Sequence, residues 1–147
     1  MTELRPVTRE NIEALLALKV HEHQKSFVST AAESLAQAYV YYETAYPFAV
    51  YDNGEPAGFI MMAYYEAKGY YTLWKFFIDK DHQHRGIGRE ALALGISFLK
   101  EKFGVSAIYT GVVPENTVAK HLYRSAGFAF TGNCEDGMEE WCLKCPT

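Results

Sequence analysis

Apolar residues recur at helical spacing in the first third of the chain. A first helix is predicted from Thr8 to about His23, because one face of this stretch carries Ile12, Leu15, Leu16 and Val20. A second helix is predicted after the segment VST at 28–30, with an inner stripe made of Leu35, Ala38, Tyr39 and Tyr42. Before both helices, the segment ELRPV at 3–7 predicts a short strand.

The middle of the chain has the pattern of an antiparallel meander. Residues 47–66 read PFAVYDNGEPAGFIMMAYYE, which predicts two strands joined by a turn at Asn53-Gly54. The segment YYTLWKFFID at 70–79 continues as a third strand. We expect this third strand to pair with the second.

The rest of the chain alternates helices and strands. The segment at 87–103 predicts a helix that buries Ala91, Leu92, Leu94, Ile96 and Leu99. The elements predicted after it are a strand at 106–113, a helix at 116–126 that Gly127 ends, and strands at 128–132 and 138–144. The resulting order, β-α-α-β-β-β-α-β-α-β-β, predicts an α/β fold whose mixed sheet has antiparallel and parallel portions.

Length and charge narrow the class of protein. A chain of 147 residues, 49% of them hydrophobic, is expected to form one domain over 1–147. Its net charge of -4 argues against nucleic acid as the main partner. No apolar run is long enough to span a membrane, and the N-terminal MTELRPVTREN is charged where a signal peptide needs apolar residues. We therefore expect a cytoplasmic protein without a membrane partner.

Three cysteines, Cys134, Cys142 and Cys145, lie near the C-terminus. The last two form a C-x-x-C pair, a spacing that zinc sites and redox sites share. Zinc needs more ligands than this pair supplies, and the surrounding EEWCLKC has the pattern of a strand rather than of the helix start typical of a redox pair. Free structural thiols are the favoured interpretation, and the pair has no assigned role.

Two H-x-H pairs raise the question of a metal site. His21 and His23 fall on the first predicted helix, where residues i and i+2 face apart. His82 and His84 fall in a polar loop. Solvated histidines, with no metal, are therefore expected at both places.

The clearest candidate for chemistry is the segment HQHRGIGRE at 82–90. Its glycines, Gly86 and Gly88, have no Cβ and let a ligand approach the backbone closely. The segment opens a predicted helix, whose free N–H groups favour an anion, and Arg85 and Arg89 add positive charge. The segment therefore predicts an anion site, and the alternative is a tight turn before a helix.

Three phosphate-binding patterns compete for this segment. A Walker A loop would need Gly-Lys-Ser/Thr, which is absent. The Rossmann pattern G-x-G-x-x-G/A is met at 86–91, but DKDHQHR at 79–85 separates the glycines from their strand, and no second mononucleotide-binding half follows. The third pattern, Gln/Arg-x-x-Gly-x-Gly/Ala, is met at 83–88.

With this third pattern and its element order, nearly the whole chain resembles the GCN5-related N-acetyltransferase (GNAT) family. Within that family, VTRENIEALLALKV, PFAVYDNGEPAGFIMM, LWKFFID and VPENTVAKHLYRSAGF look like bacterial spermine/spermidine acetyltransferases of the Blt type. The resemblance implies that the anion is the pyrophosphate of acetyl-coenzyme A. The coenzyme would be held by Gln83, His84, Arg85, Gly86, Ile87, Gly88 and Arg89, although the family often has glycine where His84 stands.

The resemblance also implies roles for the reacting end of the coenzyme. The backbone of Phe76, Phe77 and Ile78 would pair with the pantetheine arm as a strand does. Along this strand, side chains alternate, so Phe76 and Ile78 share one face. The family pattern adds coenzyme contacts at Asn116 and Ala119.

Tyr123 is the implied general acid. It lies seven residues after Asn116, two helical turns, and hence on the same face. A tyrosine with a pKa of about 10 suits protonation of a departing thiolate. The alternative interpretation of Tyr123 is a core aromatic residue on an amphipathic helix.

The base that deprotonates the attacking amine has no clear candidate. Relatives often carry a carboxylate at positions matching Thr72 or Trp74, and neither residue is acidic here. Glu22 and Glu66 are weak candidates, for which solvated surface charges are the favoured interpretation, and Trp74 is a candidate substrate contact. The tyrosines of 39–46 and 64–74 suggest either an aromatic wall for an ammonium group or ordinary strand packing.

The predicted activity is transfer of an acetyl group from acetyl-coenzyme A to a primary amine, with a polyamine such as spermine or spermidine as the expected acceptor. Direct transfer is expected, because no cysteine lies near the glycine motif. The alternatives are acetylation of an aminoglycoside or of a protein N-terminus, and a coenzyme-binding sensor without turnover. The oligomeric state stays open, with a homodimer as one option.

Overall fold

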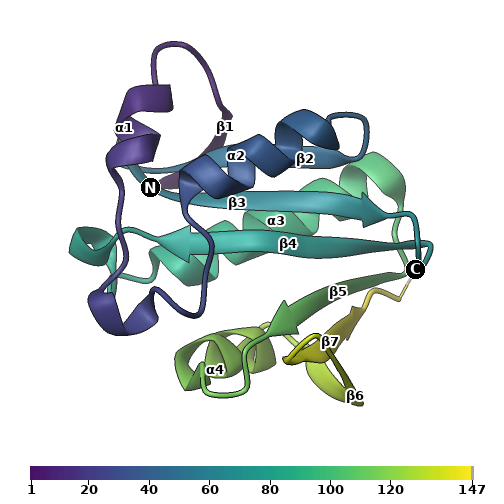
Figure 1. The fold of residues 1–147 in the computed structure, drawn as a ribbon. Coiled ribbons are helices and arrows are strands. Elements are labelled where there is room, and N and C mark those ends of the chain that lie inside the picture. Colours follow the sequence, from purple (N-terminus) through teal and green to yellow (C-terminus); the bar gives the residue numbers. More distant parts are fainter. Residues whose placement is uncertain (147) are drawn as a thin grey trace.

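A seven-stranded mixed sheet runs through the middle of the computed structural model, which describes residues 1–146 (Figure 1). The strand order is β1-β2-β3-β4-β5-β7-β6, and β4 and β5 are the one parallel pair among these neighbours. The predicted element order and fold class are confirmed. The strands are β1 (Thr2–Pro6), β2 (Ala45–Asp52), β3 (Glu55–Tyr65), β4 (Tyr70–Ile78), β5 (Ala107–Val112), β6 (Ala129–Glu135) and β7 (Met138–Lys144).

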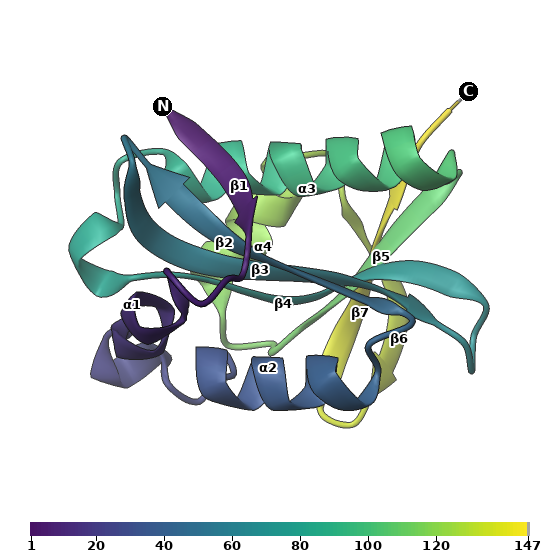
Figure 2. The ribbon, with the colours of Figure 1, turned by 90° about the horizontal axis from the view of Figure 1, so that it is seen from above.

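Helices cover both faces of the sheet. Figure 2 shows α1 and α2 on one face and the long α3 on the other. Among residues 1–146, no helix is long and apolar enough to cross a membrane. The α-helices are α1 (Ile12–Ala17), α2 (Ala31–Val40), α3 (Ile87–Phe103) and α4 (Thr117–Ser125), and two short 3₁₀ helices are η1 (Glu22–Gln24) and η2 (Lys80–His82).

The predicted turn and the predicted strand alternation are both present. Asn53 and Gly54 take positive φ angles of 50° and 82°, as a tight hairpin between β2 and β3 requires. Phe76 and Ile78 pack with the core under α3 and α4, whereas Phe77 packs with the core under α2. Strand β4, the third strand of the predicted meander, therefore contributes side chains to both cores.

The feature that positions the site is the divergence of β4 and β5. Their parallel ladder holds only three residue pairs, and it ends where Leu73 faces Thr110. Beyond this point β4 and β5 separate, as Figure 1 shows. A bulge in the β3–β4 pairing also falls here, so that Trp74 has no partner between Leu73 and Lys75. The rest of β4 therefore has an unpaired backbone edge.

The first predicted helix is wrong in its extent. Helix α1 ends at Ala17, and Leu18 is extended, with ψ 142°. The cause is tertiary, because the backbone N–H of Lys19 donates to Asp79 and the carbonyl of Lys19 accepts from Lys80. Leu15 is buried as expected, but Leu16 is exposed.

The stacking of His21 on His23 follows from this earlier helix end. Their rings lie 5.7 Å apart instead of facing apart, because the chain there is not α-helical. Among residues 1–146, no group of three or more metal-ligating side chains occurs. The three cysteines are free thiols.

The inner stripe predicted for the second helix is wrong in part. Tyr39 and Tyr42 are 82% and 73% exposed, and α2 ends before Tyr42. The buried face of α2 carries the small residues Ala31, Ser34 and Ala38, which let the helix lie close to the sheet. In α3, Leu94 is exposed in the same way, and the buried position beside it is Gly95, where an added Cβ would lie 2.9 Å from Ile60 Cδ1.

Candidate active site

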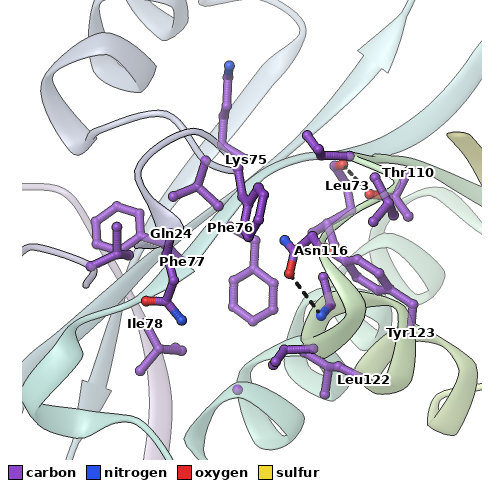
Figure 3. A pocket seen from close by; sticks show the side chains of 18 of the residues that line it. Gln24, Leu73, Lys75, Phe76, Phe77, Ile78, Thr110, Asn116, Leu122 and Tyr123 are labelled. Atoms are coloured by element: carbon purple, nitrogen blue, oxygen red, sulfur yellow. Dashed lines mark hydrogen bonds between the residues drawn. The ribbon is translucent and has the colours of Figure 1, made fainter. Parts of the chain in front are cut away.

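A first cavity of about 510 Å³ opens where β4 and β5 diverge (Figure 3). Its walls come from β4, from the end of β5, from the start of α3 and from α4. The segment between α1 and α2 closes one side with Val20, Gln24, Phe27, Val28 and Ser29. The site thus combines elements from both halves of the chain.

The glycine loop (residues 83–89) leads into α3 with its backbone exposed. Gly86 is the N-cap residue of α3, with φ 80° and no side-chain hydrogen bond to the first turn. The N–H groups at this helix start are therefore open to an anion. An added Cβ at Gly88 would meet Ile78 and Leu122 at 3.7 and 3.8 Å, so this glycine keeps the entrance of the cavity clear.

The structure brings most, but not all, of the predicted loop side chains to the first cavity. Those that line it are Gln83, His84, Gly86, Gly88 and Arg89. Arg85 is exposed and Ile87 is buried in the core, and neither lines the cavity. Because the side chain of Ile87 is buried, any part for Ile87 in holding the coenzyme would fall to its main chain.

His84 occupies a backbone conformation that suits glycine. Its φ is 64°, in the left-handed region. A residue with a Cβ is disfavoured there, which is a physical reason to expect glycine at this position.

Asn116 caps α4 at the wall of the first cavity. Its Oδ1 accepts a hydrogen bond of 3.2 Å from the backbone N–H of Ala119, and both residues line the cavity. This capping bond is drawn as a dashed line in Figure 3. The predicted pair of coenzyme contacts therefore lies at one helix start.

Tyr123 lines the first cavity and is 7% exposed. It also packs on Phe128, so both interpretations of this tyrosine describe part of its surroundings. Burial raises the pKa of Tyr123 to about 12, while a hydrogen bond between its side chain and that of Thr110 acts in the lowering direction. A phenol with this pKa stays protonated at neutral pH, so it can donate a proton but not accept one.

Thr110 ties the end of the parallel ladder to Tyr123. Its hydroxyl donates a hydrogen bond of 3.0 Å to the carbonyl of Leu73, the last β4 residue paired with β5. Thr110 is buried, and its neighbours in the sequence gave no signal of this role. The pairing of β4 with β5 places Thr110 beside Leu73, and its hydrogen bond with Tyr123 connects β5 to α4.

A second cavity of about 750 Å³ adjoins the first. Six residues line both cavities, and Lys75 is the one ionisable member of that set. Aromatic side chains supply part of the wall of the second cavity, namely Tyr41, Tyr64, Tyr65, Tyr70 and Trp74. Carboxylates supply another part, namely Glu66, Glu135, Asp136, Glu139 and Glu140.

The wall of the second cavity is held by stacking and hydrogen bonds. Tyr70 stacks on Tyr109 at 4.0 Å and donates a hydrogen bond of 3.3 Å to Glu140. Burial acts to raise the pKa of Glu140, but hydrogen bonds from Thr131 and Asn133 and the charge of Lys68 bring it below its usual value. Glu140 is therefore a carboxylate at neutral pH.

The structure separates the three candidate substrate residues. Glu66 lines the second cavity, and Trp74 lines both cavities. Glu22 lines neither, lies on η1 instead of the predicted helix, and has an 86% exposed side chain that pairs with Lys25. The predicted aromatic wall also divides, because Tyr46 and Tyr71 pack on Phe103 and Tyr39 and Tyr42 are exposed.

Sequence reasoning missed Lys75. Its Nζ donates a hydrogen bond of 2.8 Å to Ser29, and in Figure 3 it points away from Tyr123. Burial lowers the pKa of Lys75, while the charge of Glu33 acts in the opposite direction. The available signal was a single charge inside the apolar segment LWKFF.

Comparison with known proteins agrees with this geometry. The family model described as the Acetyltransferase (GNAT) family matches residues 12–128. The chain is 30% identical to a probable spermine N(1)-acetyltransferase of Bacillus subtilis subsp. natto and to a spermine/spermidine N(1)-acetyltransferase of Bacillus subtilis, with 96% of each chain covered.

Solved structures show the same fold. An aminoglycoside acetyltransferase AAC(6')-Ib in complex with coenzyme A superposes with a TM-score of 0.81 at 18% identity, covering 98% of this chain and 95% of that one. The PaiA N-acetyltransferase of Thermoplasma acidophilum in complex with coenzyme A superposes with a TM-score of 0.75 at 16% identity, covering 99% of both chains. Together with the family match over most of its length, these findings show that the chain belongs to the GNAT family and is an N-acetyltransferase that uses acetyl-coenzyme A.

Proposed function

We propose that this enzyme acetylates a primary amine of a polyamine such as spermine or spermidine. The observation that carries the proposal is the second cavity, where aromatic rings and five carboxylates lie next to the candidate coenzyme site. The two Bacillus relatives, whose names include spermine N(1)-acetyltransferase activity, support the same class of acceptor.

The second cavity suits a chain that carries several ammonium groups. Carboxylates attract an ammonium by charge, and an aromatic face attracts it by cation–π contact. Among the described residues 1–146, Glu66 and Asp136 form no side-chain hydrogen bond or ion pair, so their charges are available to a ligand. The elongated shape of a polyamine would let one amine reach the first cavity while others stay in the second.

In the proposed mechanism, the chain holds the coenzyme along β4 and α3. The open N–H groups of the glycine loop would hold the pyrophosphate, and the unpaired β4 edge from Phe76 to Ile78 would pair with the pantetheine arm. Bound in this way, acetyl-coenzyme A supplies an activated thioester. Asn116 and Ala119 would contact the coenzyme from α4.

Transfer would be direct. The neutral amine nitrogen attacks the thioester carbon, the carbon–sulfur bond breaks, and the hydroxyl of Tyr123 gives its proton to the departing sulfur. The new amide nitrogen then loses its extra proton, which restores the hydroxyl of Tyr123. None of the three cysteines lines either cavity, so no thiol is placed to carry the acetyl group. The acceptor amine arrives as an ammonium and must lose a proton before it attacks. Glu66, the one of the two candidate bases that lines the second cavity, would take this proton before the amine enters the first cavity.

The test is release of coenzyme A thiol with a panel of amines at matched concentration. We expect spermine and spermidine to be acetylated faster than an aminoglycoside or a peptide with a free N-terminus. A preference for either competitor would replace the polyamine as the substrate class. Coenzyme binding without thiol release for any of these amines would overturn the polyamine assignment and point to another class of acceptor.

A further inference from the structure

The segment between α1 and α2, Leu18–Thr30, forms one wall of the first cavity through five of its residues. Its only regular structure is the single turn of η1. A short 3₁₀ helix does not hold its own position, so the wall must be placed by contacts with the rest of the molecule. We call Leu18–Thr30 the wall segment.

The start of the wall segment is bonded to Asp79 and Lys80, the two residues that follow β4. The backbone N–H of Lys19 donates to Asp79 Oδ1 at 2.9 Å, and the carbonyl of Lys19 accepts from the backbone N–H of Lys80 at 2.7 Å. Asp79 is 6% exposed, which shields these bonds from water. The wall segment is therefore tied to the stem of the glycine loop.

A reciprocal pair of side-chain amides makes the next connection. The Nε2 of Gln24 donates to Oε1 of Gln83 at 3.2 Å, and the Nε2 of Gln83 donates to Oε1 of Gln24 at 3.0 Å. Gln83 is the first residue of the glycine loop, and Gln24 is the last residue of η1. Both residues line the first cavity.

Each glutamine also holds its own element. Gln83 Nε2 donates a hydrogen bond of 2.9 Å to the carbonyl of Ile78, which is the last residue of β4. Gln24 Oε1 accepts from the backbone N–H of His21 at 3.0 Å and so closes the turn of η1. The two amides thus connect η1, within the wall segment, to the glycine loop and to the end of β4. Alanine cannot make these directional bonds, and a shorter amide cannot make them in the same geometry.

We propose that Gln24 is a positioning residue whose amide pair with Gln83 couples the order of the glycine loop to that of the wall segment. When the glycine loop is fixed by a bound coenzyme, the wall beside the reacting end is fixed with it. A ligand can shift the wall in this way only if it favours one arrangement of the loop, and the pair supplies the link. The proposal rests on coenzyme binding at the first cavity and not on the identity of the amine.

Amide hydrogen exchange with coenzyme A alone tests the coupling. In the natural protein, saturating coenzyme A should slow exchange in both the glycine loop and residues 19–29, the latter by at least about fivefold. In Gln24→Ala and in Gln24→Asn, protection of the loop should remain and protection of 19–29 should be lost. Lys25→Ala, which removes only an exposed ion pair with Glu22, should behave as the natural protein does.

Other results would overturn the proposal. Protection of 19–29 that persists in both Gln24 variants would show that the pair is not the link. No protection of 19–29 in the natural protein would show that there is nothing to couple. Gly88→Val, which adds a side chain in the first cavity, serves as a reference for direct loss of coenzyme A binding. If Gln24→Asn loses as much coenzyme A affinity as Gly88→Val, Gln24 is a direct ligand instead of a positioning residue.

Steady-state kinetics provide a second test, because a loss of stability alone would not change the acceptor KM more than the coenzyme KM. With whichever amine the panel selects, Gln24→Asn should raise the acceptor KM by about fivefold, the effect of one neutral hydrogen bond, with a smaller change in the coenzyme KM. The double variant Gln24→Asn/Gln83→Asn should raise the acceptor KM no further than the worse single variant. Failure of the polyamine assignment would leave the exchange result intact, so the two proposals fail separately.

Discussion

At the scale of single residues, the site depends on groups whose surroundings differ from their ordinary ones. Tyr123 is buried between Phe128 and the first cavity, and His84 takes a left-handed φ at the mouth of the glycine loop. A backbone held in this region costs free energy that the surrounding structure must offset. Such a conformation commonly marks a place where a ligand approaches, and His84 lies where the coenzyme is expected.

Replacement of Tyr123 by phenylalanine tests the proposed general acid. Because the hydroxyl acts mainly in the transition state, kcat should fall by roughly 10²–10⁴-fold with little change in either KM. In the natural enzyme, Tyr123 has a pKa of about 12 and stays protonated well above neutral pH. The kcat of the natural enzyme should therefore not decline as pH rises through 10, the usual pKa of tyrosine. Tyr71→Phe, at a tyrosine that lines neither cavity, is the control for steady-state kinetics. A kcat near that of the natural enzyme would leave protonation to water.

At the scale of elements, the start of α3 and the divergence of β4 from β5 make the coenzyme site. The start of α3 is a local feature, since Gly86, a glycine with positive φ within the glycine loop, begins the helix. The second is not local, because it depends on where β5, more than thirty residues later in the chain, stops pairing with β4. Thr110 marks that point by its bond to Leu73.

The variant Gly88→Val tests the start of α3. A Cβ at this position makes only ordinary contacts, so the variant should fold, while its branched side chain fills the entrance of the first cavity. We expect affinity for acetyl-coenzyme A, measured by calorimetry, to fall at least about tenfold, a loss of about 1.4 kcal/mol.

Gly104→Ala is the matched control for this variant. Gly104 also has a positive φ, but it ends α3 at the opposite end of the helix. Alanine there should cost about 1 kcal/mol of stability through backbone strain and leave coenzyme affinity unchanged. Equal affinity in Gly88→Val and the natural protein would contradict the assignment of the glycine loop.

At the scale of the whole molecule, the second cavity joins segments that are distant in the sequence. The turn after β3 contributes Glu66 and Lys68, whereas the β6–β7 hairpin contributes Glu135 and Glu140. Lys68 pairs with Glu135 and lies 3.6 Å from Glu140, so it neutralises part of the acidic wall. A polycationic substrate would compete with Lys68 for the same carboxylates.

Removal of this competitor should improve use of a polyamine. In Lys68→Ala, the KM for spermine should fall by about twofold to fivefold with kcat unchanged, the range expected for an exposed ion pair. Added salt should shrink the difference. Lys102→Ala, on α3, serves as a control for net charge, since Lys102 lines neither cavity. A rise in the spermine KM would mean that the Lys68 ion pairs hold the shape of the wall instead.

The sequence by itself determined the features that depend on short-range periodicity and on residue type. The element order, the Asn53-Gly54 hairpin, the glycine loop before α3 and the alternation of Phe76 and Phe77 were all predictable, because each is set by neighbours a few residues away. The same local patterns carry the family resemblance that pointed to acetyl-coenzyme A.

Only the tertiary structure decided where α1 ends, which tyrosines face a cavity, and that Gln24, Lys75 and Thr110 belong to the site. The helix ends before Lys19 because the backbone N–H of Lys19 donates to Asp79, sixty residues later in the chain. No sequence pattern in either segment predicts this hydrogen bond. Small residues on α2 face the sheet and leave Tyr39 at the surface, and Tyr42 lies beyond the end of this helix. Periodicity records which face of an element is apolar, whereas the partner of that face is chosen by packing between distant segments.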